Sequence, residues 1–414
     1  MDLFWYKRVL LKLECKLTFK YKEIEMRAYI LKSRDEERIE PFGEYARDCL
    51  IGNKKLEKWQ RDVFLLLGIS ITFVSDFREI GDQDEFLYLT DNLFFTEELV
   101  KEFLQKSRHL GELTTLSLLK GNTVLRIAMG SCKGRRFEYP FFYYPQKEFR
   151  GKDFRTILID PDEFQESIRL PEHMCMGREY LIPMTDKFVI SIDHWVKLWV
   201  ANIVLILSRG AKLKKLSSFK KVMMALRSCS LNQWKILSHL NNIGSNCDIH
   251  PTAYVEGSTI GNNVKIGARA VVKESIIGND VCIGNSVTIE ESVVGDKSTI
   301  LSGHILYCVF YPSVFSVAGM ISASLIGRDS FLGVNATLTD FRFDQKNVEV
   351  FRDGSRIDSG NMFLGSCLGH GVYLGSGSII APGRVITNGL RLVPKKGIFC
   401  GNVHDEDNFK IIRR

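Results

Sequence analysis

A polar and mostly basic set of residues in the last third of the chain is suited to binding phosphate groups. Arginine presents a planar fork of donors that matches phosphate oxygens, and lysine adds a point charge. The set comprises Asn335, Asp340, Arg342, Lys346, Arg352, Arg356 and Arg384. We take Asp340, Arg342 and Arg384 as candidates for binding a phosphate or a nucleotide diphosphate. The alternative is a solvated charged loop.

Histidines near this set are candidates for a general base. An unperturbed imidazole titrates near neutral pH, so it can take a proton from a sugar hydroxyl or amine. His370, in the run LGHGVYLG, is the best placed and predicts an acyltransferase using acetyl-CoA or another acyl donor. An exposed corner histidine is the alternative. His250 is expected to be structural, and His304 lies where a repeat changes its period.

Asp91 is the third candidate, and it belongs to the N-terminal half. It follows the apolar run at 85–89 directly, in the sequence Thr90-Asp91-Asn92. Ligands of open parallel sheets bind beyond the carboxyl ends of strands. Asp91 is therefore placed to meet a ligand, and the alternative is a turn residue before the helix expected at 97–106.

A hexapeptide repeat positions the C-terminal candidates. Aliphatic-glycine pairs recur every 17 residues at Ile243, Ile260, Ile277 and Val294, with further aliphatics six residues apart. Helices repeat at 3.6 residues, so this period predicts a left-handed parallel β-helix whose coils stack to bury their apolar sides. Aromatic residues at 303–323 predict one interruption, and residues 335–370 a second, inserted one.

The N-terminal half alternates strand-like and helix-like segments. This pattern predicts an α/β domain with a mainly parallel sheet. We expect an N-terminal extension at 1–25, the α/β domain at 26–207, a basic helical linker at 208–242, the β-helix at 243–403 and a tail at 404–414.

Composition favours a cytoplasmic protein. Ten cysteines without a CxxC motif predict reduced thiols, and the N-terminus lacks a signal-peptide pattern. The apolar run at 188–207 contains Asp193, His194 and Lys197, so it predicts a buried strand and helix. No nucleic-acid motif is present. For the basic segment at 209–227, a solvated linker helix packed on the first coil is favoured over contact with anionic lipid.

Two sequence runs carry a resemblance to a known family. The first is AYILKSRDEERIEPFGEYARDCLIGNKKLEKWQ, and the second is LYLTDNLFFTEELVKEFL. Together with the hexapeptide repeat, they resemble sugar-1-phosphate nucleotidyltransferases with a C-terminal β-helix, such as the bifunctional N-acetylglucosamine-1-phosphate uridyltransferase/acetyltransferases.

The resemblance implies roles for particular residues. Arg38 matches the family's catalytic arginine, and Asp91 the aspartate that holds a divalent metal, Mg²⁺, against the nucleotide phosphates. Asp193 or Asn202 would be the second metal ligand. The substrates would be a nucleotide and a sugar phosphate, and homo-oligomers, with a trimer favoured, are expected.

The phosphate-binding loop departs from the family pattern. Ser33-Arg34-Asp35-Glu36-Glu37 replaces the glycine-rich segment whose backbone N–H groups approach phosphate. The family's lysine falls at Asp48, beside Arg47. Arg34, Arg38 and Arg47 are then the residues left to supply positive charge.

Three functions remain open from the sequence. A divergent sugar-phosphate nucleotidyltransferase, converting a nucleoside triphosphate and a sugar-1-phosphate to a sugar nucleotide and pyrophosphate, comes first. An acyltransferase with His370 as base is the second. A catalytically degenerate regulatory or assembly subunit is the third.

Overall fold

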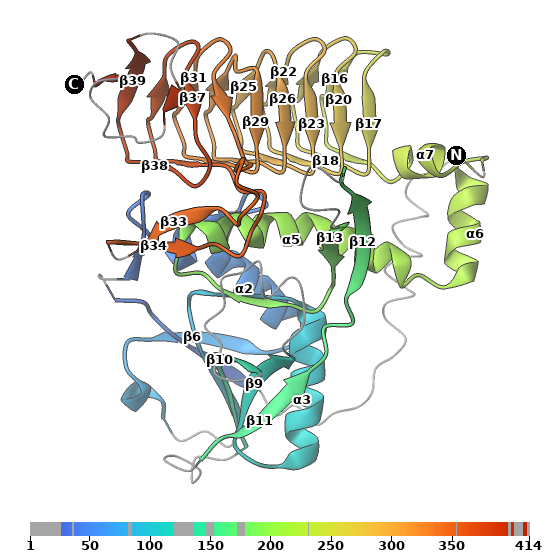
Figure 1. The fold of residues 1–414 in the computed structure, drawn as a ribbon. Helices are drawn as coiled ribbons and strands as arrows, with labels where there is room; N and C mark the ends of the chain where they lie inside the picture. The colour runs from blue at the N-terminus through green and yellow to red at the C-terminus, as the bar shows by residue number, and fades with distance from the viewer. Residues whose placement is uncertain are drawn as a thin grey trace.

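The computed structural model has two parts, a mixed α/β half and a three-sided stack of short parallel strands (Figure 1). It describes residues 26–34, 37–81, 85–119, 136–145, 153–171, 179–230, 232–352, 354–395, 399–400 and 409–411. Both parts of the predicted fold class are confirmed. The extension predicted at 1–25 and most of the tail at 404–414 lie outside the described residues.

The α/β half is built on a six-stranded sheet with the order β11-β9-β10-β7-β1-β6. Only β10 runs against the other five strands, so the sheet is mainly parallel, as predicted. The strands are β1 Arg27–Leu31, β6 Ser70–Val74, β7 Phe86–Thr90, β9 Thr114–Leu119, β10 Arg136–Tyr144 and β11 Arg155–Ile159.

Smaller elements complete this half. Two-residue strands follow β1 and form two hairpins, β2–β3 and β4–β5. The remaining pairs are β8–β14 and β12–β13, both antiparallel. Their bounds are β2 Arg38–Ile39, β3 Glu44–Tyr45, β4 Leu50–Ile51, β5 Lys54–Lys55, β8 Leu93–Phe95, β12 Phe164–Arg169, β13 Glu179–Met184 and β14 Val189–Ser191, with short 3₁₀ turns η2 Ala46–Asp48 and η3 Phe77–Glu79.

Two amphipathic helices pack on the sheet. They are α2 Leu56–Leu66 and α3 Glu97–Leu110, and each buries apolar residues at helical spacing. Thr96 stands at the N-cap of α3, as its place in the sequence indicates, but its hydroxyl accepts from Phe188 N–H (3.3 Å) instead of capping the helix.

The apolar run at 188–207 is a strand followed by a buried helix, as predicted. The strand is β14, and the helix is α5 Trp195–Lys214. Most residues of α5 are buried, because the helix runs between the β-helix and the α/β half and packs against both (Figure 1). No helix among the described residues is long and apolar enough to cross a membrane.

The C-terminal half is a prism with three sheets as faces, and their strands pair in parallel except β41, which runs antiparallel to β39. The first face is β15 Asn242–Ile243, β18 Thr259–Ile260, β21 Ile276–Ile277, β24 Val293–Val294, β27 Val309–Phe310, β30 Leu325–Ile326, β35 Cys367–Leu368 and β38 Val385–Ile386. The second is β16 Asp248–Ile249, β19 Lys265–Ile266, β22 Cys282–Ile283, β25 Thr299–Ile300, β28 Phe315–Ser316, β31 Phe331–Leu332, β36 Tyr373–Leu374, β39 Arg391–Pro394 and β41 Phe409–Ile411. The third is β17 Tyr254–Glu256, β20 Val271–Lys273, β23 Thr288–Glu290, β26 His304–Leu306, β29 Met320–Ser322, β32 Thr337–Leu338, β37 Ile379–Ile380 and β40 Phe399–Cys400.

The predicted aromatic interruption at 303–323 is wrong. The coils continue through this segment with their pairing intact, but each is one residue shorter, because Val294 pairs with Phe310 and Phe310 with Ile326, steps of 16 residues. Phe310 fills the interior of the prism, and Phe315 stacks outside it on Phe331, with ring centroids 5.8 Å apart. Bulky rings therefore fit the coil when the aromatic side chains of neighbouring coils stack.

The second predicted interruption is confirmed. Ile326 in β30 pairs with Leu368 in β35, so 41 residues separate the two partners. Within this stretch lies an antiparallel hairpin, β33 Glu349–Arg352 and β34 Ser355–Asp358. The hairpin lies beside the α/β half (Figure 1), where Phe351 O is 3.2 Å from His194 Nε2.

The first face of the prism carries the contact between the two halves. Both residues of most of its strands are apolar, so one side chain points inward and the other outward. The outward residues Ile276, Val293, Val309, Leu325 and Cys367 join the apolar cluster that contains α5. The second and third faces place polar or partly exposed residues at many of the equivalent outward positions.

Hydrogen bonds between the two halves fix how they are placed against each other. Trp199 Nε1 on α5 donates to Tyr307 O (2.7 Å), and Tyr311 Oη accepts from Leu50 N–H (3.0 Å). Asn202, a candidate metal ligand, is fully buried and structural instead. Its side chain accepts from Gly52 N–H (2.8 Å) and donates to the carbonyl of Leu50 (3.1 Å), which ties the β4–β5 hairpin to α5.

The basic linker contains two further helices, α6 Ser218–Arg227 and α7 Gln233–Ser238. The expectation that the linker helix packs on the first coil is wrong for α6, of which no residue is buried. α7 packs against β17, a strand of the first coil.

A row of glutamates lies at the corner of the prism that faces α5. Glu274 and Glu291 occupy equivalent corner positions in successive coils, each with a positive φ. Burial raises the pKa of Glu291 to about 8, and the charges of Glu274 and Glu290 add to this effect. Lys273 opposes it. Burial also raises the pKa of the neighbouring Glu274, and Arg209 on α5 partly offsets that rise.

We expect Glu291 to make the protein less stable as the pH rises from about 5 to 8. The carboxyl pKa is raised from 4.5 to about 8 in the folded protein. Within this window the unfolded chain releases the proton and the folded chain keeps it, so the free energy of unfolding falls. Glu291→Gln should flatten this fall and stabilise the protein at pH 8 in denaturant titrations. A variant as pH-sensitive as the wild type would contradict the prediction.

Gly52 should tolerate alanine less well than Gly68. Both have a positive φ, of 55° and 69°, which costs a residue with a Cβ about 1–2 kcal/mol. A Cβ at Gly52 would also lie 2.6 Å from Leu205 Cδ2 and 3.3 Å from Ile276 Cδ1, whereas nothing lies within 4 Å at Gly68. Overpacking should lower the free energy of unfolding of Gly52→Ala by about 1–3 kcal/mol more. If urea unfolding shows that Gly52→Ala and Gly68→Ala lower the free energy of unfolding equally, the contact of Gly52 with Leu205 and Ile276 is loosely packed.

Candidate functional site

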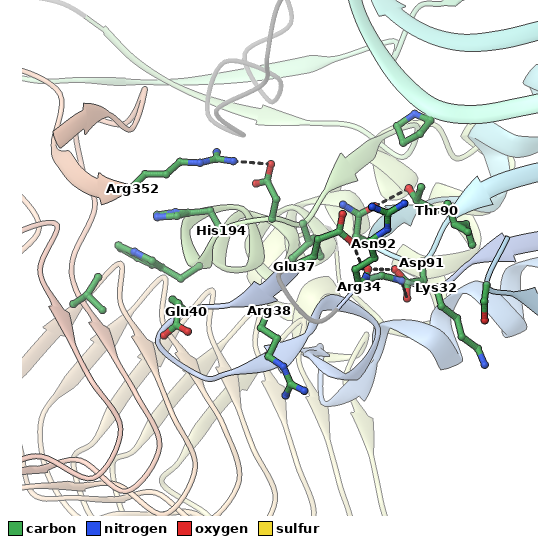
Figure 2. Close-up of a pocket in the computed structure, with 18 of the residues that line it drawn as sticks. Lys32, Arg34, Glu37, Arg38, Glu40, Thr90, Asp91, Asn92, His194 and Arg352 are labelled. Carbon is green, nitrogen blue, oxygen red and sulfur yellow. Dashed lines mark hydrogen bonds and ion pairs between the residues drawn. The ribbon is translucent and has the colours of Figure 1, made fainter. Parts of the chain in front are cut away.

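The candidate site is a cavity of about 640 Å³ at the carboxyl ends of β1 and β7. Parts of the chain that are distant in sequence line it, and they include the loop after β1, the end of β7, the segment leading into α5, and the β33–β34 hairpin of the C-terminal half (Figure 2). The lining residues include Lys32, Arg34, Glu37, Arg38, Asp91, Asn92, Asp193, His194 and Arg352. Four of the predicted site residues, Arg34, Arg38, Asp91 and Asp193, are therefore brought together.

Asp91 is fully buried, and its carboxylate is bound by the protein itself. Oδ2 accepts from Ser33 N–H (2.8 Å) and from Arg47 Nη1 (2.7 Å), and Oδ1 accepts from the Ser33 hydroxyl. The backbone is held as well, since Asp91 N–H donates to Leu31 O (3.0 Å) and Gln60 Nε2 donates to Asp91 O (3.1 Å). Asp91 thus joins the ends of β1 and β7 through its bonds to Leu31 and Ser33, and Arg47 in η2 balances its charge.

The predicted arginines differ in what they contact. Arg47 pairs with Asp91 and lies over the Tyr45 ring, 4.1 Å from its centroid. Arg38 lies over the same ring and donates to Tyr45 Oη (3.1 Å) and Gly43 O (3.0 Å). Arg34 is exposed at the cavity. Of the three, Arg34 is the one whose charge is most available to a ligand.

Asp193 and His194 connect α5 to the hairpin. Asp193 pairs with Lys197 (2.8 Å) and with Arg352 Nη2 (3.2 Å), which reaches across from β33 (Figure 2). Burial lowers the pKa of His194. Its Nδ1 accepts from Val196 N–H (3.3 Å), so the neutral tautomer donates from Nε2 to Phe351 O.

The donor set does not fit a divalent metal ion as it stands. Among the described residues no group of three or more histidines, cysteines, aspartates or glutamates converges on one point. Magnesium prefers carboxylate oxygens together with several waters, but Asp91 and Asp193 each accept from cationic side chains. Arg47 lies within 2.7 Å of the oxygen that a cation bound to Asp91 would approach.

The other predicted phosphate-binding residues line a second cavity, of about 540 Å³, beside the insertion. Asp340, Arg342 and Arg384 all contribute to it. The Arg342 guanidinium bonds both oxygens of Asp344, at 2.9 and 2.6 Å, and lowers the pKa of that carboxyl to about 2. Asp340 accepts from Ser322 Oγ (2.6 Å). Acidic partners therefore already occupy much of the hydrogen-bonding capacity of Arg342.

His370 lies between the two halves of the molecule. Its Nδ1 accepts from Arg328 N–H (3.1 Å), and Nε2 is 3.2 Å from Glu44 Oε1. Its ring packs on Phe42 and Tyr311, with centroids 4.9 and 5.7 Å away. Both ring nitrogens are thus engaged by the protein, which argues against the predicted role as a general base.

Part of the C-terminal half is similar to a known domain. Residues 223–314 match the family model of the GMPPB C-terminal domain. The matched stretch runs from the middle of α6 through the coils up to β27. No match is found among the curated proteins.

Sequence reasoning missed several residues of the cavity. Lys32 and His194 line it but were not proposed as site residues. Lys32 directly follows β1, so the strand-end argument that selected Asp91 applies to it equally. Arg352 belongs to the basic set seen in the sequence, but its pairing with Asp193 joins residues 159 positions apart, and no local pattern indicates such a contact.

We expect Arg47→Ala to destabilise the protein by about 3 kcal/mol or more. Removing one partner of a buried ion pair leaves the other charge uncompensated, and Asp91 is fully buried. The control is Arg61→Ala, which removes an exposed helical pair with Glu57 and should cost less than about 1 kcal/mol. Chemical denaturation of both variants measures the difference. Equal losses would mean that Arg47 does not compensate the Asp91 charge.

Proposed function

We propose that the cavity at the ends of β1 and β7 binds a phosphorylated sugar or a sugar nucleotide. The observation that carries this proposal is the convergence of Lys32, Arg34, Arg38 and Arg352 on one cavity, together with the buried Asp91. Phosphate and diphosphate groups are the ligands that such a set of cations recognises.

The resemblance to sugar-1-phosphate nucleotidyltransferases supports the same ligand class. GMPPB, whose C-terminal domain model matches residues 223–314, is GDP-mannose pyrophosphorylase B, an enzyme of that family. Arg38 and Asp91 stand at the family's positions, and both line the cavity. The protein is then a divergent relative that holds phosphate with side-chain cations in place of a glycine-rich loop.

Nucleotidyl transfer is the second candidate function. It is favoured by the placement of Arg38 and Asp91 on one cavity. Arg47 would have to leave Asp91 before a metal could bind there. If it does not leave, the ligand binds without turnover, which is the regulatory or assembly role that the sequence left open. The acyltransferase, the homo-oligomer and the cytoplasmic location stay predictions.

Calorimetric binding measurements test the proposal. We expect a panel of sugar nucleotides and sugar phosphates to include a ligand that binds equally with EDTA and with magnesium. Lys32→Gln and Arg34→Gln should each weaken that ligand about tenfold or more, because a hydrogen bond to a charged group contributes about 1.5–3 kcal/mol. Arg78→Gln, at an exposed arginine outside the lining of the cavity, is the matched control.

The same panel separates binding from catalysis. Pyrophosphate release that requires magnesium and is lost in Asp91→Asn would establish nucleotidyl transfer. Binding without pyrophosphate release would support the non-catalytic role. If no ligand binds, or if Arg34→Gln binds as tightly as Arg78→Gln, the cavity is not a phosphate site.

A further inference from the structure

Helix α6 presents an apolar face to solvent that no part of the described chain covers. Four large side chains are exposed: Phe219 by 74%, Val222 by 56%, Met223 by 49% and Leu226 by 65%. At 3.6 residues per turn they fall within an arc of about 100°. No residue of α6 is buried. Packing against the described residues therefore buries little of this helix, and its apolar stripe can contact another surface.

The surroundings of α6 are strongly basic. Residues 209–247 contain eight lysines and arginines and no aspartate or glutamate. Three of these lysines are neutralised at the end of α5, where Lys212, Lys214 and Lys215 pair with Glu98, Glu166 and Asp186. Lys220 and Arg227 on α6 have no ion pair with any described acid. Both border the apolar stripe, about 80–100° from Phe219 around the helix.

We propose that α6 docks this protein on an anionic lipid surface. An interfacial helix buries its apolar residues at the boundary between headgroups and acyl chains, while lysines and arginines at its border contact anionic headgroups. α6 has this arrangement in a single short helix. Its position at one side of the molecule (Figure 1) allows contact without moving the two larger halves.

Charge and shape favour lipid over the other occupants. A second copy of the chain would bring an identical basic helix against this one, and the like charges would repel. An acidic peptide matches the charge, but the four apolar side chains form an uninterrupted stripe on a convex helix. The apolar interior of a bilayer boundary matches such a stripe and does not require a complementary groove.

Vesicle flotation of the full chain tests the proposal. We expect binding to vesicles of phosphatidylcholine mixed with phosphatidylglycerol, weakening with salt, and little binding to phosphatidylcholine alone. Lys220→Gln with Arg227→Gln should lower affinity about 25-fold, from about fivefold for each charge near the surface. Phe219→Ser with Leu226→Ser should lower it more than about tenfold. Because these residues are exposed, the variants should fold, and circular dichroism checks this.

Matched controls distinguish vesicle binding through α6 from nonspecific binding by the rest of the protein. Leu65→Ser with Leu66→Ser changes two leucines that are 76% and 69% exposed on α2, and Lys58→Gln with Lys265→Gln removes two exposed charges elsewhere. Both controls should bind vesicles like the wild type. The proposal fails if the controls weaken binding as much as the α6 variants. It also fails if the wild type does not bind anionic vesicles and sedimentation velocity shows a dimer that Phe219→Ser with Leu226→Ser dissociates. That result would mean that the apolar stripe contacts a second copy of the chain.

Discussion

The arrangement of the two halves depends on one apolar face of the β-helix, which is stable only when it is buried. Most coils place two adjacent apolar residues on this face, one directed into the prism and one outward. Fully burying such a side chain is worth about 1.5–3 kcal/mol, so a row of outward residues from Ile276 to Cys367 strongly favours a cover. α5 is that cover, and it is apolar on several sides because the α/β half packs on its other surface.

The geometry of the candidate site follows from this packing. Because α5 is fixed on the prism, the residues that lead into it, Asp193 and His194, face the hairpin inserted between β30 and β35. The hairpin closes a cavity whose opposite wall is formed by the ends of β1 and β7. Neither half of the chain builds this cavity alone, so the β-helix acts as more than a spacer. It supplies Arg352 and Phe351 to a site that begins in the N-terminal sheet.

The sequence predicts what local periodicity and strand order control. The aliphatic-glycine period identified the coils, the strand-end rule selected Asp91, and the family resemblance selected Arg34 and Arg38; all three residues line one cavity. The errors concern contacts made by the packing of distant segments. Tyr311 belongs to the segment 303–323, whose aromatic residues predict an interruption, and His370 is the predicted general base, but both pack between the halves around Phe42 and Glu44. Asn202 was read as a possible metal ligand, but it binds the backbone of a hairpin 150 residues away. Such roles depend on which surfaces meet, and no short-range pattern encodes them.

Two acidic side chains that line the cavity are each paired with cationic side chains of the same chain. A carboxylate as buried as Asp91 needs a cation beside it, and Arg47 supplies that cation from within the chain. Asp193 is balanced in the same way by Lys197 and Arg352. Once the acids are paired internally, Lys32 and Arg34 at the cavity edge retain exposed charges. Ion pairs within the chain therefore balance Asp91 and Asp193, two of the acids that line the cavity.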